Sequence, residues 1–280
     1  MPDRFAEEEV RRALEEDDAR RDVTTALLGQ TGDTTARGRF LTEAPAIVAG
    51  GPVVREVFFQ LDPAIQFEQH IPEGARAARG AVIATAGGPA RALLAGERVA
   101  LNFLQRLSAI ATATRRAVDA VAGTGAIITD TRKTTPGLRA LEKYAVRMGG
   151  GENHRLSLAD AVLWKDNHWE LLGRSGRSLA EVLRAGPPGT PVTVEVENEA
   201  QFEAALVAGV KRILVDNQPP ERVAAWARRA GPVAIEASGG ITPETALAYA
   251  RAGARYISIG ALTHSAAAAA IRLDLEVVAT

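Results

Sequence analysis

Basic side chains between residues 130 and 155 form the densest group in this sequence that could do chemistry. The stretch holds six Lys or Arg against three Asp or Glu, although the whole chain has a net charge of -1. Gly149, Gly150 and Gly151 also stand within it, and glycines let backbone approach a ligand closely. A positive cluster in a nearly neutral protein needs an anion to explain it. We therefore expect a site for a small anionic molecule.

Two kinds of cation are available for that anion. Arg132 and Arg155 have planar guanidinium groups that match a carboxylate or a phosphate, whereas Lys133 and Lys165 are compact point charges. His154 stands beside Arg155, shortly after the three glycines. We expect His154 to be functional and several of the cations to be ligands.

The middle of the basic stretch predicts a helix over residues 137–148. Arg139 and Lys143 lie one turn apart on it, with Glu142 beside them. Charges at this spacing are typical of a solvated helix face, so we expect Arg139 and Lys143 to face solvent. His70 and His168 stand alone, and we expect surface or structural roles for them.

Two turns that carry glycine could bind phosphate. Ser238, Gly239 and Gly240 follow one predicted strand, and Gly260 follows the last one. Without a side chain in the way, backbone N–H groups at a helix amino terminus can bind an anion. Phosphate sites at the last two strands of parallel barrels use this arrangement. His264, just after the second turn, is a further candidate.

Glu195 and Asp216 end consecutive predicted strands, which would bring both carboxylates to one rim of a barrel. Such a pair suggests Mg²⁺, because this hard ion is commonly held by one or two carboxylates plus substrate phosphate. Either carboxylate could instead orient Lys133 or Lys165 through a salt bridge. Glu197 faces the same side of its strand as Glu195 and competes for the same role.

Short apolar runs that alternate with helical stretches must position these groups. After Gly125 many of the runs recur roughly every 20 residues, about one strand and helix each, and polar residues follow several of them. This rhythm is typical of a parallel α/β barrel, whose active site lies at the carboxyl ends of its strands. About seven strands can be counted, and the clearest cover residues 126–128, 161–164, 192–196, 212–215, 233–237 and 256–259.

The first part of the chain predicts a separate α+β domain. Its helical patterns and β-like pieces occupy residues 5–20, 37–43, 53–61, 65–71, 81–86 and 90–122. The tail alternates apolar and charged residues as a strand does, and we expect it to return to this domain. The predicted domains are residues 1–108 with the tail strand 270–280, and a barrel over residues 109–269.

Composition excludes several classes of protein. The 280 residues are 46% hydrophobic, enough for an ordinary core, and the absence of Cys rules out disulfides, thiolate nucleophiles and cysteine zinc sites. The balanced charge argues against a general nucleic-acid binder. No apolar run approaches the roughly 20 residues that span a bilayer. We expect a cytoplasmic protein that binds neither nucleic acid nor membrane.

These motifs together resemble a known family. The match follows the chain in order through GER at 96–98, the stretch 130–155, KDNH at 165–168, VEVE at 194–197, VDN at 215–217, ASGGI at 237–241 and IGALTHS at 259–265. The sequence closely resembles the carboxylating nicotinate-nucleotide pyrophosphorylases, which are the quinolinate phosphoribosyltransferases of NAD biosynthesis. The resemblance implies an amino-terminal α+β domain joined to an open seven-stranded α/β barrel. It also implies an Mg²⁺-dependent reaction of quinolinate with phosphoribosyl pyrophosphate that gives nicotinate mononucleotide, pyrophosphate and CO₂.

The resemblance implies roles for individual residues. The quinolinate carboxylates would be held by Arg132, His154, Arg155 and Lys165. The ribose, pyrophosphate and metal would lie near Lys133, Glu195 and Asp216, which with Lys165 are the predicted catalytic residues. The phosphate cradle would be Ser238, Gly239, Gly240, Gly260 and His264. Arg98 would reach the site of a neighbouring subunit, which implies a homodimer or an assembly of dimers.

Two other functions stay open at this point. A Schiff-base lyase on a barrel would need Lys133 or Lys165 to be desolvated. A binding or accessory homologue would keep the fold without the chemistry. Four intact residues argue against it: Arg155, Lys165, Glu195 and Asp216. Trp164 is bulkier than the aliphatic residue expected before Lys165, which concerns only the packing of that loop.

Overall fold

The computed structural model describes residues 6–278, whose packing divides them into two compact units. The first unit holds the residues up to Arg115, the segment Thr135–Gly150 and the residues from Ser265 on. The second unit holds Arg116–Thr134 and Gly151–His264. The predicted domain limits at residues 108 and 269 stay a prediction. By packing, the middle of the basic stretch belongs to the first unit, while both its ends belong to the second.

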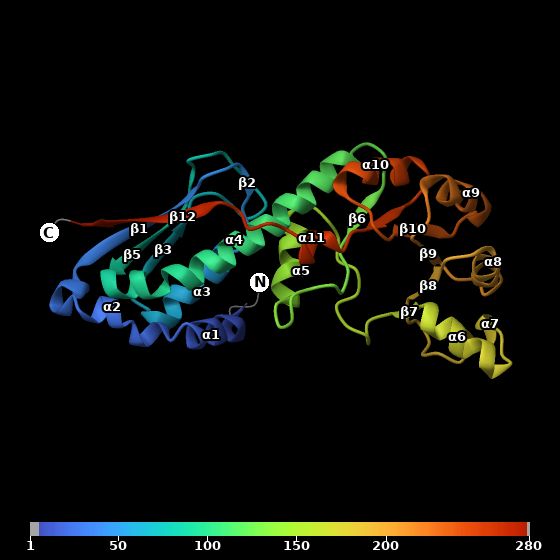
Figure 1. Cartoon of the computed structure of the whole chain (residues 1–280), viewed down its shortest axis with the longest axis horizontal. Coiled ribbons are helices and arrows are strands. Elements are labelled where there is room, and N and C mark those ends of the chain that lie inside the picture. Colours follow the sequence, from blue (N-terminus) through green and yellow to red (C-terminus); the bar gives the residue numbers. More distant parts are fainter. Residues whose placement is uncertain (1–5, 279–280) are drawn as a thin grey trace. The chain divides into compact units, whose positions relative to one another are not determined.

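A four-stranded antiparallel sheet is the frame of the first unit (Figure 1). Every second residue of the strand Thr35–Thr42 is buried, as in a sheet that packs one face on a core. The tail strand pairs with this strand from Ala36 to Thr42, so the tail lies in the sheet of the first unit. The strand order is β12 (Ile271–Val277), β1 (Thr35–Thr42), β5 (Val82–Pro89) and β3 (Gln66–Gln69), and β2 (Ala46–Ile47) pairs separately with β4 (Arg76–Ala77).

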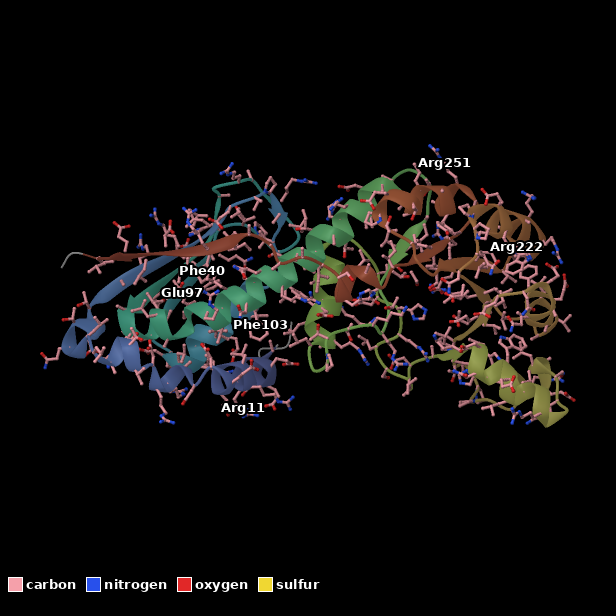
Figure 2. All side chains as sticks on the ribbon, in the orientation of Figure 1. Arg11, Phe40, Glu97, Phe103, Arg222 and Arg251 are labelled. Atoms are coloured by element: carbon pink, nitrogen blue, oxygen red, sulfur yellow. The ribbon has the colours of Figure 1, made fainter. Side chains whose placement is uncertain are left out.

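Amphipathic helices cover the apolar face of this sheet. Phe58 packs against Phe40 of β1, with their ring centroids 6.1 Å apart (Figure 2 labels Phe40). The helices predicted over 53–61 and 90–122 are confirmed, whereas the first helix ends at Glu16 and a 3₁₀ turn follows at Ala19–Arg21. Residue 5, where that helix was predicted to begin, lies outside the described residues. The helices are α1 (Glu7–Glu16), α2 (Val23–Ala26), α3 (Gly51–Leu61) and α4 (Ala90–Ala120).

The second unit is a parallel α/β sheet, which confirms the predicted fold class. Its strand order is β6 (Ile127–Thr129), β11 (Tyr256–Ser258), β10 (Ala234–Ser238), β9 (Arg212–Asp216), β8 (Val192–Val196) and β7 (Val162–Trp164), and every pairing among them is parallel. The helices of this unit are α6 (Asp166–Ser175), α7 (Leu179–Arg184), α8 (Glu199–Val207), α9 (Pro220–Ala230), α10 (Pro243–Arg251) and α11 (Ala261–His264). Figure 1 shows α8, α9 and α10 along the outer side of the strands.

The sheet has six hydrogen-bonded strands within residues 6–278, so a seventh full strand stays a prediction. One feature supports it. Glu152 forms an isolated parallel bridge with Thr129 on the side of β6 that faces away from β11. Glu152 thereby adds a one-residue seventh position to the strand order, and the sheet stays open between Glu152 and β7.

The outer helices present charged residues to solvent and aromatic residues to each other. Arg222 on α9 and Arg251 on α10 are exposed (Figure 2). On the covered side, Phe202 of α8 stacks on Trp226 of α9 with ring centroids 4.8 Å apart. The Trp226 indole N–H donates to Glu199 at 2.9 Å, so its polar group is satisfied although the ring is buried.

The helix α5 (Arg139–Met148) corrects the expectation of a solvated face. Lys143 and Glu142 are fully buried, and Arg139 is partly buried. The carboxylate of Glu142 accepts from Arg106 Nη2 at 2.7 Å and from the Thr135 hydroxyl at 2.8 Å. A charge can be buried when it is paired and hydrogen-bonded. Arg106 lies 36 residues away along the chain, which is why spacing within the helix did not reveal the burial.

Candidate active site

A cavity of about 460 Å³ lies at the carboxyl ends of the strands of the second unit. This is the end of a parallel barrel at which active sites are built. Most of the residues that the sequence singled out line it. The lining residues are Asp130, Thr131, Arg132, Lys133, His154, Arg155, Leu163, Lys165, Glu195, Leu214, Asp216, Glu236, Ser238 and Ser258.

The two turns predicted to bind phosphate lie beside this cavity. The close contacts within them explain why glycine stands at two of their positions. A Cβ on Gly260 would come within 3.1 Å of Lys133 Cδ and 3.2 Å of His264 Nε2, so Gly260 separates two predicted site residues. A Cβ on Gly239 would lie 2.2 Å from the side-chain oxygen of Asn217. Gly239 also has a φ of +94°, which favours glycine. Gly240 has a positive φ but open space around it.

Arg98 does not line the cavity. It is exposed on α4 in the part of that helix that belongs to the first unit. The prediction that Arg98 acts in the site of a neighbouring subunit therefore concerns a second chain and not this cavity.

An oppositely charged pair lies at one side of the cavity. Glu195 is buried at the end of β8, and its Oε2 lies 3.3 Å from Lys165 Nζ. Burial raises the pKa of Glu195, Lys165 lowers it and the nearby carboxylate of Asp216 raises it again; the net direction is upward. Glu197, the competing residue, is exposed beyond β8 and does not line the cavity. Glu195 is therefore the carboxylate of this pair that faces Asp216.

The two arginines of the cavity are poorly neutralised by the protein. Burial lowers the pKa of Arg155, and the neighbouring charge of Arg132 lowers it further, against opposing effects of Asp160 and Glu195. The Nε atom of Arg132 is buried and has no hydrogen-bond partner within the described residues. Two adjacent guanidinium groups with an unsatisfied donor indicate a site for an anionic ligand.

The segment that carries His154 and Arg155 is held by buried groups. Asp130 is fully buried and accepts from the Asn153 amide at 2.5 Å and from the backbone N–H of His154 at 2.8 Å. The backbone N–H of Glu152 donates to Ile128 O at 2.9 Å. The end of β6 and the end of the basic stretch are thus fixed to each other.

Glu236 lies fully buried at the base of the cavity, and sequence reasoning missed it. Its Oε2 accepts from Arg212 Nε at 2.7 Å, its Oε1 accepts from Ser258, and His154 Nε2 lies 3.6 Å from the same Oε1. Although burial alone would raise it, His154 and Arg212 together hold the pKa of Glu236 below its usual range. Glu236 is therefore ionised inside the barrel.

The alternation of side chains along the strands could have revealed the missed residues. Residues two apart on a strand share a face, so a residue two positions before a strand-end site residue also faces the cavity. Glu236 precedes Ser238 in this way, and Ser258 precedes Gly260. Leu163 before Lys165 and Leu214 before Asp216 follow the same rule and supply apolar lining.

Comparison with known families identifies the family to which the chain belongs. The family model for the C-terminal domain of quinolinate phosphoribosyl transferase matches residues 110–274, and the model for its N-terminal domain matches residues 22–108. The chain belongs to the quinolinate phosphoribosyltransferase family. The resemblance seen in the sequence motifs is thereby confirmed.

Members of the quinolinate phosphoribosyltransferase family match this chain over nearly its full length. The nicotinate-nucleotide pyrophosphorylase [carboxylating] of Mycobacterium leprae is 43% identical over 278 residues, which cover 96% of this chain and 97% of that protein. The probable nicotinate-nucleotide pyrophosphorylase [carboxylating] of Bacillus subtilis is 43% identical over 245 residues, covering 87% and 85%. The solved nicotinate-nucleotide pyrophosphorylase structure from Francisella tularensis has a TM-score of 0.90 at 33% identity, covering 99% and 98%.

The carboxylates of Glu195 and Asp216 fit the ion that the sequence resemblance implies. Within residues 6–278 no group of three or more His, Asp or Glu is placed to hold a metal. Glu195 and Asp216 are oxygen donors close enough for the charge of one to raise the pKa of the other. Mg²⁺ keeps several waters and is commonly held by one or two carboxylates plus substrate phosphates, so a pair without a dedicated cage suits it.

The loop after β7 has a structural histidine, as expected. Nδ1 of His168 accepts from the backbone N–H of Lys165 at 2.9 Å and closes a capping box on α6. Trp164 packs beside His168 and Trp169, with ring centroids 5.3 Å and 6.2 Å away. The bulky residue before Lys165 is therefore accommodated against α6.

Across the described residues, no helix is long and apolar enough to cross a membrane.

Proposed function

We propose that this chain is a quinolinate phosphoribosyltransferase of NAD biosynthesis, a pentosyltransferase. It transfers the phosphoribosyl group of phosphoribosyl pyrophosphate to quinolinate and yields nicotinate mononucleotide, pyrophosphate and CO₂. One observation carries the proposal: in a chain of this family, Arg132, Lys133, Arg155 and Lys165 line one cavity with the carboxylate pair of Glu195 and Asp216. The relatives from Mycobacterium leprae and Bacillus subtilis are named for the same product chemistry.

Quinolinate would bind on the arginine side of the cavity. It is a dianion with adjacent carboxylates, and removing two charges from water is costly unless fixed cations and hydrogen bonds offset the loss. Arg132 offers an unsatisfied buried donor there, and Arg155 and Lys165 add two further charges. His154 completes that wall of the cavity. Nicotinate lacks one carboxylate and would leave a cation unpaired, so the site should reject it.

Phosphoribosyl pyrophosphate would bind across the carboxylate pair and the glycine turns. Ser238, Gly239, Gly240, Gly260 and His264 would hold its 5′-phosphate through backbone N–H groups and side-chain donors. Lys133 lies beside Gly260 and would offset charge on the pyrophosphate. Glu195 and Asp216 would hold Mg²⁺, which when bound neutralises charge that develops on the leaving pyrophosphate.

The chemistry then needs two steps, each of which forms one bond and breaks another. The ring nitrogen of quinolinate bonds to C1 of the ribose while the bond from C1 to the pyrophosphate oxygen breaks, and the pyrophosphate leaves with the electron pair. Carboxylates beside the ribose stabilise its oxocarbenium character in the transition state. The ring nitrogen is now cationic and accepts electron density as the carbon–carbon bond to the adjacent carboxylate breaks. CO₂ departs, and a proton takes its place on the ring carbon.

The proposal includes a homodimer, or an assembly of dimers, as the working enzyme. Arg98 is exposed and does not line the cavity of its own chain. In a shared site it would supply a further cation to the quinolinate bound by a neighbouring subunit.

The lysine environment argues against a Schiff-base lyase. An activated Schiff-base lysine is desolvated in an apolar pocket or placed beside another cation. The side chain of Lys165 is 46% exposed and ion-paired with Glu195, and Lys133 is exposed. Both therefore lack the desolvated setting that a Schiff-base lysine needs.

Product analysis tests the proposed function. Purified protein with Mg²⁺, phosphoribosyl pyrophosphate and quinolinate should give nicotinate mononucleotide, detected by chromatography. The same mixture with nicotinate in place of quinolinate should give at least about 100-fold less product, because a buried cation is left unpaired. Equal use of nicotinate would contradict the assigned substrate.

A further inference from the structure

The imidazole of His154 has a different protein group at each nitrogen. The backbone N–H of Arg155 donates to Nδ1 at 2.9 Å. A backbone N–H can only donate, so Nδ1 carries no hydrogen. The other nitrogen, Nε2, lies 3.6 Å from Oε1 of Glu236. The ring proton therefore belongs on Nε2 and faces the carboxylate.

Glu236 is itself held on all sides. The carboxylate is fully buried and accepts from Arg212 and Ser258. Ser258 shares a second hydrogen bond with Thr129 at 2.7 Å, and the Arg212 guanidinium lies 3.7 Å from the centre of the Tyr256 ring. Neighbouring strands of the barrel thus fix Glu236. The segment with His154 and Arg155 is attached to the end of β6 by a one-residue bridge at Glu152 and by hydrogen bonds to Asp130.

We propose that Glu236 is a positioning residue of the active site, which keeps His154 in the Nε2–H form so that Nδ1 holds the backbone of Arg155. The guanidinium of Arg155, which lines the cavity and donates to Ala161 O at 3.1 Å, is then set by a buried carboxylate that need not touch substrate. The partner of one imidazole nitrogen decides which nitrogen carries the proton. The inference rests on the proposed function only for the identity of the ligand that Arg155 meets.

The variant Glu236→Gln removes this control with little change in volume. Donors from Arg212, Ser258 and His154 converge on two carboxylate oxygens, but Gln has one oxygen and an NH₂ group. Arg212 is always charged and keeps the oxygen, so the NH₂ group is left for His154. Nε2 then becomes an acceptor, the proton moves to Nδ1, and the Arg155 amide loses its partner.

Nitrogen-15 NMR of histidine side chains reads the tautomer directly. The chain has four His, and the signals lost in His154→Gln assign those of His154. In the wild type we expect Nε2–H with an unprotonated Nδ1, and in Glu236→Gln a shift toward Nδ1–H. The KM for quinolinate should rise about 10- to 100-fold in Glu236→Gln, the size of effect seen when a group that orients a metal-binding histidine is removed, while the KM for phosphoribosyl pyrophosphate stays within about 3-fold.

Glu142→Gln is the matched control. Glu142 is also fully buried and paired with an arginine, at 2.7 Å, but it does not line the cavity. It should lose stability and leave the tautomer of His154 and the KM for quinolinate unchanged. A folded Glu236→Gln that keeps Nε2–H and the wild-type KM would overturn the inference. Should that variant not fold, the wild-type spectrum still decides, because a proton on Nδ1 would refute it. Should the wild type form no nicotinate mononucleotide, the proposed function fails, and the imidazole spectra still test the role of Glu236.

Discussion

Arg155 is a cation of the cavity whose charge is disfavoured by its surroundings. Burial and the charge of Arg132 both act against its own charge, so an anion in the cavity should relieve an unfavourable arrangement. The side chain also carries a fork of donors, which lysine cannot reproduce at a site that binds a planar carboxylate.

We therefore predict that Arg155→Lys weakens the use of quinolinate without removing the positive charge. Losing a hydrogen bond to a charged group costs about 1.5–3 kcal/mol, or about a 10- to 100-fold fall in kcat/KM. Steady-state kinetics with quinolinate varied would measure this. Arg251→Lys on the exposed face of α10 (Figure 2) should behave as the wild type. Equal effects of the two substitutions would argue against a ligand role for Arg155.

The buried charge of Glu236 also predicts a pH dependence of stability. Its pKa in the folded chain lies below the ordinary value of 4.5. A carboxyl with a lowered folded pKa contributes stability above its unfolded pKa and loses it as pH falls through the folded value. The difference in the free energy of unfolding between the wild type and Glu236→Gln should therefore be constant from about pH 6 to 8 and shrink below about pH 4.5.

Urea unfolding of both proteins at several pH values measures that difference. Glu181→Gln is a useful comparison, because Glu181 has a lowered pKa at an exposed helix cap of α7 rather than in the core. A difference between wild type and Glu236→Gln that grows as the pH falls would contradict the assignment of an ionised Glu236.

At the residue scale, the sequence revealed the cations and Glu195 but not the fully buried carboxylate of Glu236. Arg132, Lys133, Arg155 and Lys165 were visible because a basic stretch in a neutral chain stands out, and all four line the cavity. Glu236 lies inside β10 and not at the strand end, where polar residues mark a site, although alternation along β10 places it beneath Ser238. The burial of Lys143 could not be predicted from the sequence, since it depends on how α5 packs within the first unit.

At the scale of elements, the backbone geometry of the turn after β10 limits which residue types can stand there. Asn217 adopts a φ of +52°, donates from its side chain to Asp216 at 2.6 Å and donates its backbone N–H to Ser238 O at 2.9 Å. This places Asn217 against Gly239 and leaves no room for a Cβ there. The ends of β9 and β10 are thereby joined beside the carboxylate of Asp216.

Gly239→Ala should therefore be much more harmful than Gly240→Ala. Both positions have positive φ, which costs a non-glycine residue about 1–2 kcal/mol, but only at Gly239 would a Cβ lie 2.7 Å from backbone, the N atom of Asn217. Forced overlap of this kind typically costs a further 1–3 kcal/mol or so. The free energies of unfolding from urea titration, and the KM for phosphoribosyl pyrophosphate, would compare the two. A smaller loss at Gly239 than at Gly240 would show that the turn is not constrained as described.

The elements themselves were largely predictable. Short apolar runs followed by polar residues gave the strands of the second unit to within a few residues, because parallel strands are buried on both faces. The seventh position of the sheet was not predictable, since a single bridge at Glu152 leaves no periodic pattern in the sequence. The first helix is shorter than predicted: α1 ends at Glu16, with Asp17 as its C-cap and Asp18 in the left-handed conformation.

At the scale of the whole molecule, the two units share one chain in an interleaved way. The segment Thr135–Gly150 belongs to the first unit, while Lys133 before it and His154 after it line the cavity of the second. A periodicity argument cannot reveal such interleaving, because it depends on which distant residues bury α5. The family resemblance, carried by motifs over nearly the full length, was the stronger guide to architecture.

Subunit mixing tests whether the site is shared. Arg98→Ala removes the cation expected to act on a neighbouring subunit, and Lys165→Ala damages the cavity of its own chain. Each variant alone should be nearly inactive, with a loss of at least about 100-fold in kcat/KM for a missing charged ligand contact. Mixed dimers can form one site with both residues intact, so random mixing should restore up to about a quarter of wild-type activity, on statistical grounds. No recovery, with subunit exchange proven by mass spectrometry of the intact dimer, would count against a shared site.

The stoichiometry of the overall reaction tests the central claim most directly. Quinolinate labelled with carbon-13 in the carboxylate next to the ring nitrogen would be incubated with purified protein, Mg²⁺ and phosphoribosyl pyrophosphate, with pyrophosphate and labelled CO₂ measured together. The proposed function predicts one pyrophosphate and one labelled CO₂ for each nicotinate mononucleotide formed. Pyrophosphate release without labelled CO₂, or no turnover of quinolinate at all, would contradict it.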